Sequence, residues 1–407
     1  MKTNKLYIAL VGLPARGKST IANRLKDNLR KDNIRVRIFN NGDLRRRLTD
    51  PSSSNPEFYA PRNTEGTALR EHIAMINIAR AKNYLARNGQ VAVIDATHAS
   101  KKRRDKLSRL LDDHPVLFIE CINEDETILE ASVLRKITLP EFNHLSREAA
   151  IESFNKRIAY YQTIYSPLND ERNFVILNSL HNKILKEEIS DTIPFYDRTR
   201  DFLVTDTVKT LFLVRHGETY FNLENRIGGD SGLTENGWGQ ADAIAGYFGK
   251  VKIPFIFTST KKRTKQTAIP VQAEQKGCET ISLKEFDEID SGICECMSYE
   301  EIREKFPEIY AARKKDKYNY LYPEGEGYTT MRDRIYTGIK KALYLSGTAD
   351  RIMIIGHRGV NRMILAHFLY RRQEDVPYIY VPQDKYYHIV ATQDKKLLQL
   401  KPFMQIR

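Results

Sequence analysis

Two short motifs in this chain contain residues that could handle phosphoryl groups, and they could do so in different ways. Residues 12–19, GLPARGKS, match the G-x-x-x-x-G-K-[ST] pattern of a loop that wraps nucleotide phosphates. Residues 215–218, RHGE, and the later pair Gly356-His357 set two histidines beside basic residues. The first motif predicts phosphoryl transfer from a nucleoside triphosphate. The second predicts transfer onto a histidine and then to water.

The first motif has the residue types that a nucleotide site needs. Its glycines let the backbone approach the phosphate oxygens, its lysine supplies a mobile positive charge, and its serine offers a hydroxyl to Mg²⁺. The run Leu6–Leu13 reads as a buried strand and a helix should start near Ser19, so the helix N-terminus would also favour the anion. The predicted nucleotide-binding residues are Gly12, Gly17, Lys18, Ser19 and Thr20.

A carboxylate and two basic groups should lie close to this loop. Asp95 ends the strand pattern VAVID, where a carboxylate for Mg²⁺ or for proton abstraction belongs, although a helix N-cap is the plainer alternative. Ser19 and Asp95 are therefore the predicted metal ligands. The basic groups 45–47 and 101–104 also follow strand ends, which favours an anionic acceptor substrate over a merely solvated face.

The second motif requires a cationic pocket, because the charge on a phosphate repels a neutral imidazole. His216 would be the nucleophile, with Arg215, Arg263 and His357 around the phosphate. The leaving alkoxide needs a proton donor. Spacing alone leaves four candidates open in the segment EFDEIDSG, namely Glu285, Asp287, Glu288 and Asp290.

Strand and helix patterns alternate twice along the chain. Strands are expected at 5–11, 36–39, 91–94, 116–119 and 174–177 and again at 210–214, 255–257 and 351–355, with helices between them and a last helix over 360–370. The alternation fails over residues 191–209. We therefore predict an α/β protein with two three-layer domains built on parallel sheets, residues 1–205 and 206–407.

Composition limits the class of protein. With 41% hydrophobic residues and no apolar run near the roughly 18 residues of a membrane span, we expect a soluble protein without a membrane partner. Four cysteines without a CxxC pair indicate free thiols in a reducing cytoplasm. The net charge of +13 could serve nucleic acid or small polyanions. Because the basic groups lie inside folded segments, we expect no nucleic-acid partner.

Five stretches carry a resemblance to a known family. GLPARGKS, FNNGDLRRR, VIDATHASKKRR, NKRIAYYQTIYSPLN and LVRHGE together resemble the 6-phosphofructo-2-kinase/fructose-2,6-bisphosphatase family over nearly the whole chain. The resemblance implies a P-loop kinase fused to a histidine-phosphatase domain of the phosphoglycerate-mutase-like fold, and a homodimer. It implies synthesis of fructose 2,6-bisphosphate from fructose 6-phosphate and MgATP, and hydrolysis of the product through a phosphohistidine.

The resemblance also implies roles for individual residues. In the kinase, Asp95 would be the catalytic carboxylate and Lys136 would neutralise the moving phosphoryl group. Contacts to fructose 6-phosphate would come from Arg45, Arg70, Thr97, Arg103, Arg157 and Tyr161. In the phosphatase the resemblance selects Glu288 as proton donor, beside His216 and His357 as catalytic residues. Substrate contacts there would come from Arg215, Asn222, Gly228, Arg263, Tyr299, Arg313, Lys317, Tyr328 and Arg362.

Three positions depart from the family pattern. Asn123 stands where the family has a cysteine and Ala131 where it has an asparagine near the nucleotide, so adenine selectivity and turnover are left open. Arg358 replaces a glutamine after the second histidine. We expect Arg358 to contact substrate and to strengthen inhibition by product phosphate. Two other functions remain as alternatives: a nucleic-acid end-processing kinase/phosphatase, or an enzyme with one activity whose other site senses a ligand.

Overall fold

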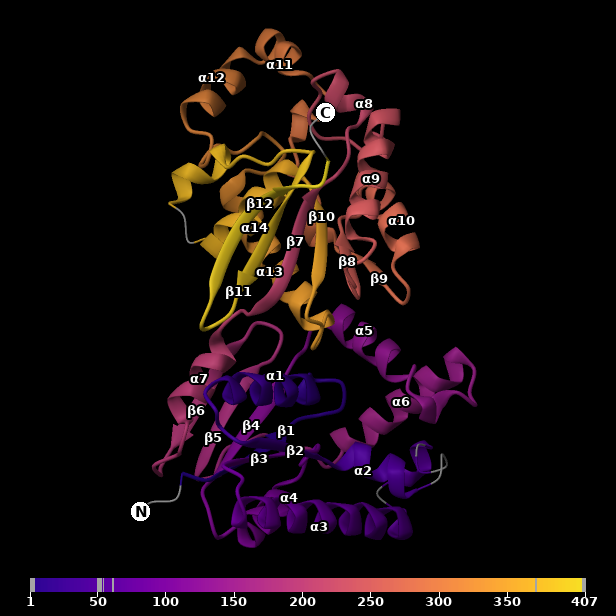
Figure 1. Cartoon of the computed structure of the whole chain (residues 1–407), viewed down its shortest axis with the longest axis vertical. Helices are drawn as coiled ribbons and strands as arrows, with labels where there is room; N and C mark the ends of the chain where they lie inside the picture. Colours follow the sequence, from indigo (N-terminus) through magenta and orange to yellow (C-terminus); the bar gives the residue numbers. More distant parts are fainter. Residues whose placement is uncertain (1–3, 50–52, 54, 61, 370–371, 405–407) are drawn as a thin grey trace. The chain divides into compact units, whose positions relative to one another are not determined.

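Two six-stranded sheets organise the chain, and each belongs to its own compact unit, Met1–Thr205 or Asp206–Arg407 (Figure 1). The computed structural model describes residues 4–49, 53, 55–60, 62–369 and 372–404. Within these residues, no helix has both the length and the apolar character needed to cross a membrane. The two units are described separately below.

The first sheet has the strand order β2-β3-β1-β4-β5-β6. Its strands are β1 (Leu6–Val11), β2 (Val36–Asn40), β3 (Val91–Asp95), β4 (Val116–Ile122), β5 (Asn173–Asn178) and β6 (Lys183–Ile189). Neighbouring strands run parallel except for β6, which pairs antiparallel with β5 at the edge. The carboxyl ends of β1, β3 and β4 therefore meet at one edge, where the phosphate loop lies.

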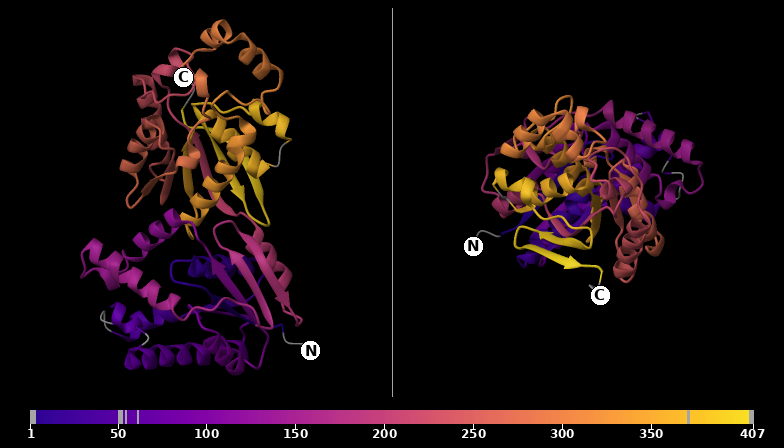
Figure 2. Two further views of the ribbon diagram at one scale, coloured as in Figure 1. Left: turned by 180° about the vertical axis from the view of Figure 1, so that it is seen from behind. Right: turned by 90° about the horizontal axis from the view of Figure 1, so that it is seen from above.

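Alternate side chains of β1 enter two separate cores, which explains the three layers. Leu6, Ile8 and Leu10 pack with α1 (Lys18–Lys31) and α7 (Tyr196–Val204) on one face of the sheet. Tyr7, Ala9 and the other intervening residues pack with α3 (Thr64–Ala86) and α4 (Lys101–Leu110) on the opposite face. A strand buried on both faces is continuously apolar, as β1 is. Figure 2 shows the same elements from behind.

Short helices extend the first unit beyond the sheet. They are α2 (Asn41–Leu48), η2 (Pro56–Tyr59), α5 (Glu126–Lys136), η3 (Pro140–Phe142) and α6 (Arg147–Gln162). A small core of Val133, Phe142, Ala150 and Phe154 joins α5, η3 and α6, and Ala15 of the phosphate loop packs into it. This core ties the segments that carry Lys136 and Arg157 to the nucleotide loop.

The second sheet has the order β12-β11-β7-β10-β8-β9. Its strands are β7 (Val208–Arg215), β8 (Phe255–Thr258), β9 (Glu279–Ser282), β10 (Ile352–Gly356), β11 (Lys385–Ala391) and β12 (Lys396–Pro402). The strands β7 to β10 are parallel to one another, whereas β11 pairs antiparallel with both β7 and β12. Both β7 and β10 end immediately before a histidine, and they are neighbours, so the two histidines meet.

Helices enclose the second sheet and carry residues toward its carboxyl edge. Helices α9 (Glu235–Phe248) and α10 (Lys262–Glu274) share a core with β7, β8 and β10. Helices α13 (Tyr328–Leu345) and α14 (Arg358–Leu369) pack on each other, and α14 contacts β7. The remaining helices are α8 (Tyr220–Leu223), η4 (Lys284–Phe286), η5 (Gly292–Cys294), α11 (Tyr299–Lys305), α12 (Pro307–Lys315) and η6 (Gln373–Tyr378).

The predicted fold class is confirmed, with local differences. The expected strands and long helices are present within a few residues of their predicted ends. The antiparallel strands β6, β11 and β12 were not predicted, nor were α2 and α5. The segment 191–209, expected to be irregular, contains α7 and the start of β7. The last predicted helix was expected to reach Tyr370, which lies outside the described residues.

Candidate active sites

The phosphate loop connects β1 to α1 and needs both of its glycines. Gly12 has φ of 132° and Gly17 has φ of 84°, a region that side chains with a Cβ rarely adopt. A Cβ on Gly12 would also lie 2.5 Å from the carbonyl oxygen of Cys121. The Gly12 amide donates to the carbonyl oxygen of Thr97 at 3.0 Å, which links the loop to the segment after β3. Ser19 and Thr20 follow in the first turn of α1.

Lys18, Asp95 and Lys136 form a buried charged group beside this loop. Burial lowers the pKa of Lys18 to about 8, while the charge of Asp95 opposes that shift. Burial raises the pKa of Asp95, against hydrogen bonds from Ser19 and Asn40 and the charges of both lysines. Burial also lowers the pKa of Lys136, again with Asp95 opposing. The three groups therefore act on one another at the carboxyl edge of the sheet.

The two predicted metal ligands lie close together, since Ser19 lowers the pKa of Asp95 against the effect of burial. Oxygen ligands of this kind suit Mg²⁺, which usually takes one or two protein groups and completes its shell with phosphates and water. No cluster of three or more histidine, cysteine or acidic side chains that could hold a metal occurs among the described residues. The donor set thus fits a Mg²⁺ ion that arrives with a nucleotide.

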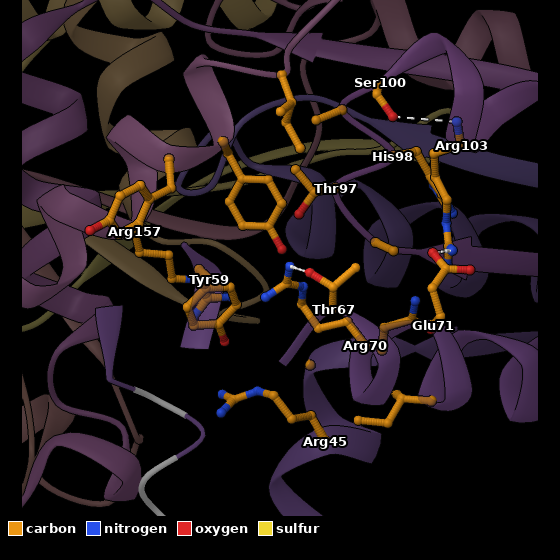
Figure 3. A pocket seen from close by; sticks show the side chains of 18 residues that line it. Arg45, Tyr59, Thr67, Arg70, Glu71, Thr97, His98, Ser100, Arg103 and Arg157 are labelled. Atoms are coloured by element: carbon orange, nitrogen blue, oxygen red, sulfur yellow. Dashed lines mark hydrogen bonds and ion pairs between the residues drawn. The ribbon is translucent and has the colours of Figure 1, made fainter. Parts of the chain in front are cut away.

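A cavity of about 380 Å³ is lined in part by the segment after β3, which contacts the phosphate loop through Thr97 (Figure 3). All six residues predicted to contact the acceptor line this cavity, and they come from α2, α3, α4, α6 and the segment after β3. These residues are Arg45, Arg70, Thr97, Arg103, Arg157 and Tyr161. Four guanidinium groups around one cavity make it suitable for an anionic ligand of sugar-phosphate size.

The ring of Tyr59 lies close to three of these arginines (Figure 3). The guanidinium carbons of Arg157, Arg70 and Arg45 are 4.1, 5.6 and 5.9 Å from its centroid. Arg45 is also paired with Glu141, and the tilted ring of Tyr161 has its centroid 5.9 Å from that of Tyr59. Among the described residues, the Tyr59 hydroxyl and Arg157 Nε are buried without a hydrogen-bond partner. Tyr59 was not predicted, because PEFY resembles an ordinary core turn.

The remaining cavity residues have defined partners. Arg103 pairs with Glu71 of α3, and Arg70 donates to the carbonyl oxygen of Phe58.

Of the departures from the family pattern, Asn123 follows β4 and is 1% exposed. Its amide oxygen accepts from Asp125 N, and its amide nitrogen has no partner in the described part of the chain. Ala131 is half-buried on α5.

In the second unit, His216 has the tautomer of a nucleophile. Its Nδ1 lies 2.7 Å from the carbonyl oxygen of Gly217, which can only accept, so Nδ1 carries the proton and Nε2 holds the free lone pair. Burial lowers its pKa well below the ordinary histidine value, and the charges of Arg263 and Arg215 lower it further. The imidazole is therefore neutral at neutral pH.

His357 lies beside His216, with ring centroids 5.2 Å apart. Arg263 Nε donates to His357 Nδ1 at 3.1 Å, so Nε2 carries the proton and donates to Ser259 Oγ at 2.8 Å. Burial lowers the pKa of His357 well below its ordinary value, with Arg263 the next cause. His357 is thus neutral and has a partner on each nitrogen. Ser259 was not predicted, because nothing in the sequence sets this serine apart.

Arg215 is crowded by other positive charges. Burial lowers its pKa to about 9, with further contributions from Arg358, Arg362 and Arg263, whereas Glu288 acts in the opposite direction. Its Nε is buried without a partner among the described residues. Arg358 is exposed at the first position of α14. Positive charges this close together repel one another when the pocket is empty, and a bound anion relieves that repulsion. The arrangement therefore suits a pocket for phosphate.

The loop around Gly228 completes the pocket. Gly228 has φ of 67°, and Arg263 donates to the carbonyl oxygen of Gly229 at 2.9 Å. Gln383 Nε2 donates to the His216 carbonyl oxygen at 3.2 Å and to Asn222 Oδ1 at 3.1 Å. Gln383 was missed because it lies far along the chain, in a stretch without any phosphate-binding motif.

Of the four acidic candidates, Glu288 contacts the backbone close to the second histidine. Its Oε2 accepts from Gly359 N at 3.1 Å, and Gly359 is two residues after His357. Its charge acts on Arg215 and on Arg263. The other three are engaged elsewhere: Glu285 with Lys341, Asp287 with Thr260, and Asp290 with the amide of Gly292. A second cavity, of about 660 Å³, is lined by Gly228, Arg263 and Glu288 among others.

The predicted remote contacts form a second basic group. Arg313 donates to the Tyr299 hydroxyl at 3.2 Å, and Arg362 donates to the Tyr328 hydroxyl at 3.1 Å. Burial lowers the pKa of Lys317 to about 8, followed by the charges of Arg313, Arg362 and Arg358. Lys317 therefore lies in the field of these arginines. The structure thus brings the predicted phosphatase residues into one region, and their individual roles stay predictions.

Comparisons with known proteins give two family models, each for its own part of the chain. Residues 1–208 match the family model for 6-phosphofructo-2-kinase, and residues 211–401 match the model for the histidine phosphatase superfamily, branch 1. Alpha-ribazole phosphatase from Shigella flexneri, a solved structure, has 23% identity and a TM-score of 0.44, with 47% of this chain and 96% of that chain covered.

Relatives match both units at once. 6-Phosphofructo-2-kinase/fructose-2,6-bisphosphatase 1 of Rattus norvegicus is 34% identical over 387 residues, with 92% of this chain and 79% of the relative covered. The 6-phosphofructo-2-kinase/fructose-2,6-bisphosphatase of Aquarana catesbeiana is 35% identical over 389 residues, with 92% and 80% covered. The chain belongs to the 6-phosphofructo-2-kinase/fructose-2,6-bisphosphatase family.

Proposed function

We propose that this chain is a bifunctional enzyme that makes and destroys fructose 2,6-bisphosphate. Residues 1–205 would transfer the γ-phosphoryl group of ATP to the 2-hydroxyl of fructose 6-phosphate. Residues 206–407 would hydrolyse the product to fructose 6-phosphate and phosphate. The single observation that carries the proposal is that each unit pairs a reactive group with an arginine-rich pocket. The family relationship supports the same pair of activities.

In the kinase, the cavity arginines would hold the 6-phosphate and so bring the 2-hydroxyl toward Asp95. Burial raises the pKa of Asp95, which suits a carboxylate that accepts the hydroxyl proton. Lys18 and Lys136 would balance charge on the moving phosphoryl group. Mg²⁺, held by Ser19 and Asp95, would supply positive charge to the ATP phosphates. Gly12, Gly17 and Thr20 belong to the loop and helix turn that would hold the nucleotide.

In the phosphatase, His216 Nε2 would attack the 2-phosphoryl group. Its neutral state and fixed tautomer support this role. Arg215, Asn222, Gly228, Arg263 and His357 would surround the phosphoryl oxygens, and Glu288 would protonate the leaving oxygen. The second basic group, Tyr299, Arg313, Lys317, Tyr328 and Arg362 with Arg358 nearby, would bind the sugar and its 6-phosphate.

Further expectations about the setting of the enzyme remain proposals. Sugar phosphates and ATP are the proposed partners, and a cytoplasmic location and a homodimer are consistent with the family relationship. Neither a nucleic-acid substrate nor a purely sensory site is favoured by any particular contact. Size-exclusion chromatography with light scattering would test the homodimer.

The decisive experiment separates the two activities. A His216→Ala variant incubated with fructose 6-phosphate and MgATP should accumulate acid-labile fructose 2,6-bisphosphate, because the product is not hydrolysed. A Lys18→Ala,His216→Ala double variant should form none. Phosphorylation of a different acceptor, or ATP hydrolysis without sugar phosphorylation, would contradict the proposed substrate.

A further inference from the structure

The proposed proton donor lies on a segment without regular secondary structure. Glu288 falls between η4 and η5, outside every helix and strand. Its carboxylate is held by the amides of Gly359 and Ile289, both at 3.1 Å. These two contacts direct the side chain and leave its backbone to be fixed by other groups. The backbone that carries a proton donor must be held in place, because proton transfer requires hydrogen-bond distance to the leaving oxygen.

Arg334 of α13 holds this backbone in place through hydrogen bonds from its whole guanidinium group. Nη1 donates to the carbonyl oxygens of Glu285 at 2.8 Å and Asp287 at 2.7 Å, and Nη2 donates to that of Glu288 at 3.4 Å. Nε and Nη2 also donate to the carboxylate of Glu326, Nε at 2.8 Å. An arginine has five N–H donors in a rigid planar fork, and these contacts use all of them.

The partner of Arg334 holds the far end of the same segment. The Glu326 amide donates to the Asp290 carbonyl oxygen at 2.8 Å, and the Asp290 amide donates to the Glu326 carboxylate at 3.3 Å. The pKa of Glu326 is lowered although burial opposes the shift, because Arg334 hydrogen-bonds its charged form. The Arg334–Glu326 pair therefore contacts the backbone on both sides of Glu288.

The same face of α13 is shaped to receive this segment. Gly338 lies one turn after Arg334, and a Cβ there would lie 2.6 Å from the Phe286 ring and 2.9 Å from Glu285 Cβ. Lys341, further along the helix, pairs with the Glu285 carboxylate at 2.8 Å. Close approach at Gly338 and the ion pair hold η4 on the helix, which sets the distance that Arg334 spans.

We propose that Arg334 is a positioning residue that, with Glu326, holds the Glu288 carboxyl where it can protonate the leaving oxygen. This inference rests on the proposed phosphatase function. The step it concerns is balanced within the site: His216 Nε2 forms a bond to phosphorus as the bond from phosphorus to the sugar 2-oxygen breaks. The electron pair stays on that oxygen, and the Glu288 proton moves to it. Water then forms a bond to phosphorus as the bond from phosphorus to His216 Nε2 breaks. The nitrogen keeps that electron pair, and a proton of the water moves to Glu288.

Leaving-group dependence provides a test that a general loss of structure would not reproduce. Rapid mixing would follow the first turnover, as release of fructose 6-phosphate from fructose 2,6-bisphosphate and of nitrophenolate from p-nitrophenyl phosphate. Nitrophenolate is stable as an anion and leaves without a proton. We therefore expect Arg334→Gln to slow fructose 6-phosphate release by about 10- to 100-fold, within the usual contribution of a general acid. Nitrophenolate release should change less than about threefold by the same reasoning.

Three further variants complete the design. Arg334→Lys keeps the positive charge but not the planar set of donors, so it should slow fructose 6-phosphate release in the same selective way. A thermal stability equal to that of the wild type would show that the variant is folded. Glu288→Gln is the reference for a missing proton donor. Arg332→Gln is the matched control, since Arg332 lies on the same helix and its Nε pairs with Asp333 at 3.1 Å. It should behave like wild type.

The outcomes are distinguishable. A parallel loss on both substrates in Arg334→Gln and Arg334→Lys would overturn the positioning role in favour of a structural one. Selective loss in Glu288→Gln with none in either Arg334 variant would overturn this inference alone. Unchanged fructose 6-phosphate release in Glu288→Gln would overturn the proposed role of Glu288 and the inference with it.

Discussion

Arg263 donates its Nε–H to Nδ1 of His357, and this bond sets the protonation state of the second histidine. Because Nδ1 is an acceptor, the proton of His357 must lie on Nε2, which donates to Ser259. A second proton on His357 would meet the Arg263 donor directly. The same arginine lowers the pKa of His216 after burial does. Burial first and then this one cation therefore favour the neutral form of both imidazoles.

The acid limb of phosphatase activity should consequently lie at unusually low pH. An unperturbed histidine titrates near 6.5, and the pKa of both His216 and His357 is lowered well below that value. The proposed nucleophile His216 attacks only in its neutral form, so on this proposal kcat/KM should stay level as pH falls through 6.5 and drop only below it. Initial rates across pH 4–8, with stability checked at each pH, would measure this. A limb centred near 6.5 would contradict it.

Lys18 predicts a different pH dependence for the kinase. Its pKa is lowered to about 8 by burial, so the nucleotide-free site loses this charge as pH rises above that value. Bound phosphates favour the charged form, so binding above about pH 8 must take up a proton and weaken with rising pH. Calorimetric Kd values for MgATP should therefore increase from pH 7.5 to 9.5. A Lys18→Arg variant, whose charge persists, should bind with little change over that range.

Tyr59 predicts a gain in stability from a lost hydroxyl. Its Oη is buried without a partner among the described residues, and such a group costs about 1–3 kcal/mol. Tyr59→Phe should therefore raise the free energy of unfolding of the first unit by about 1 kcal/mol. Hydrogen exchange of the β1 amides would report it. Tyr7→Phe is the matched control: Tyr7 Oη donates to Asp113 at 3.0 Å, and its removal should destabilise.

Much of this arrangement follows from sequence because the chemistry sits at strand ends. Gly12 and Lys18 belong to a motif that predicts the nucleotide loop. A histidine directly after an apolar strand of a parallel sheet must lie at the carboxyl edge of that sheet. The edge strand β6, KILKEEI, was missed because its mostly exposed, charged residues lack the alternation of a half-buried strand. β12 was missed for the same reason, with exposed and half-buried residues only.

Residues that act through backbone contacts could not be predicted in this way. Arg334 binds carbonyl oxygens, which every residue has, so no spacing of side chains marks its partners. Gln383 likewise reaches the His216 carbonyl from a segment far along the chain. The position of Tyr59 in the cavity depends on tertiary packing alone, because three arginines from different helices meet over its ring. These contacts exist only once the chain is folded.

Arg358 predicts how strongly product phosphate inhibits the enzyme. It is exposed, begins α14, and its charge lowers the pKa of Arg215, His216 and Lys317. A cation so close to the phosphate pocket should attract the product as well as the substrate. Arg358→Gln should therefore raise the Ki for inorganic phosphate by roughly 3- to 10-fold, a typical effect of one partly screened charge.

The same substitution should move the acid limb of the pH profile. With one positive charge removed, His216 is protonated more easily, so its pKa rises and the limb shifts to higher pH. Glutamine keeps a polar side chain without the charge, and Arg332→Gln on α13 provides a control that removes the same charge elsewhere on the chain. Equal phosphate Ki values in wild type and Arg358→Gln would show that this guanidinium lies too far from the phosphate to act on it.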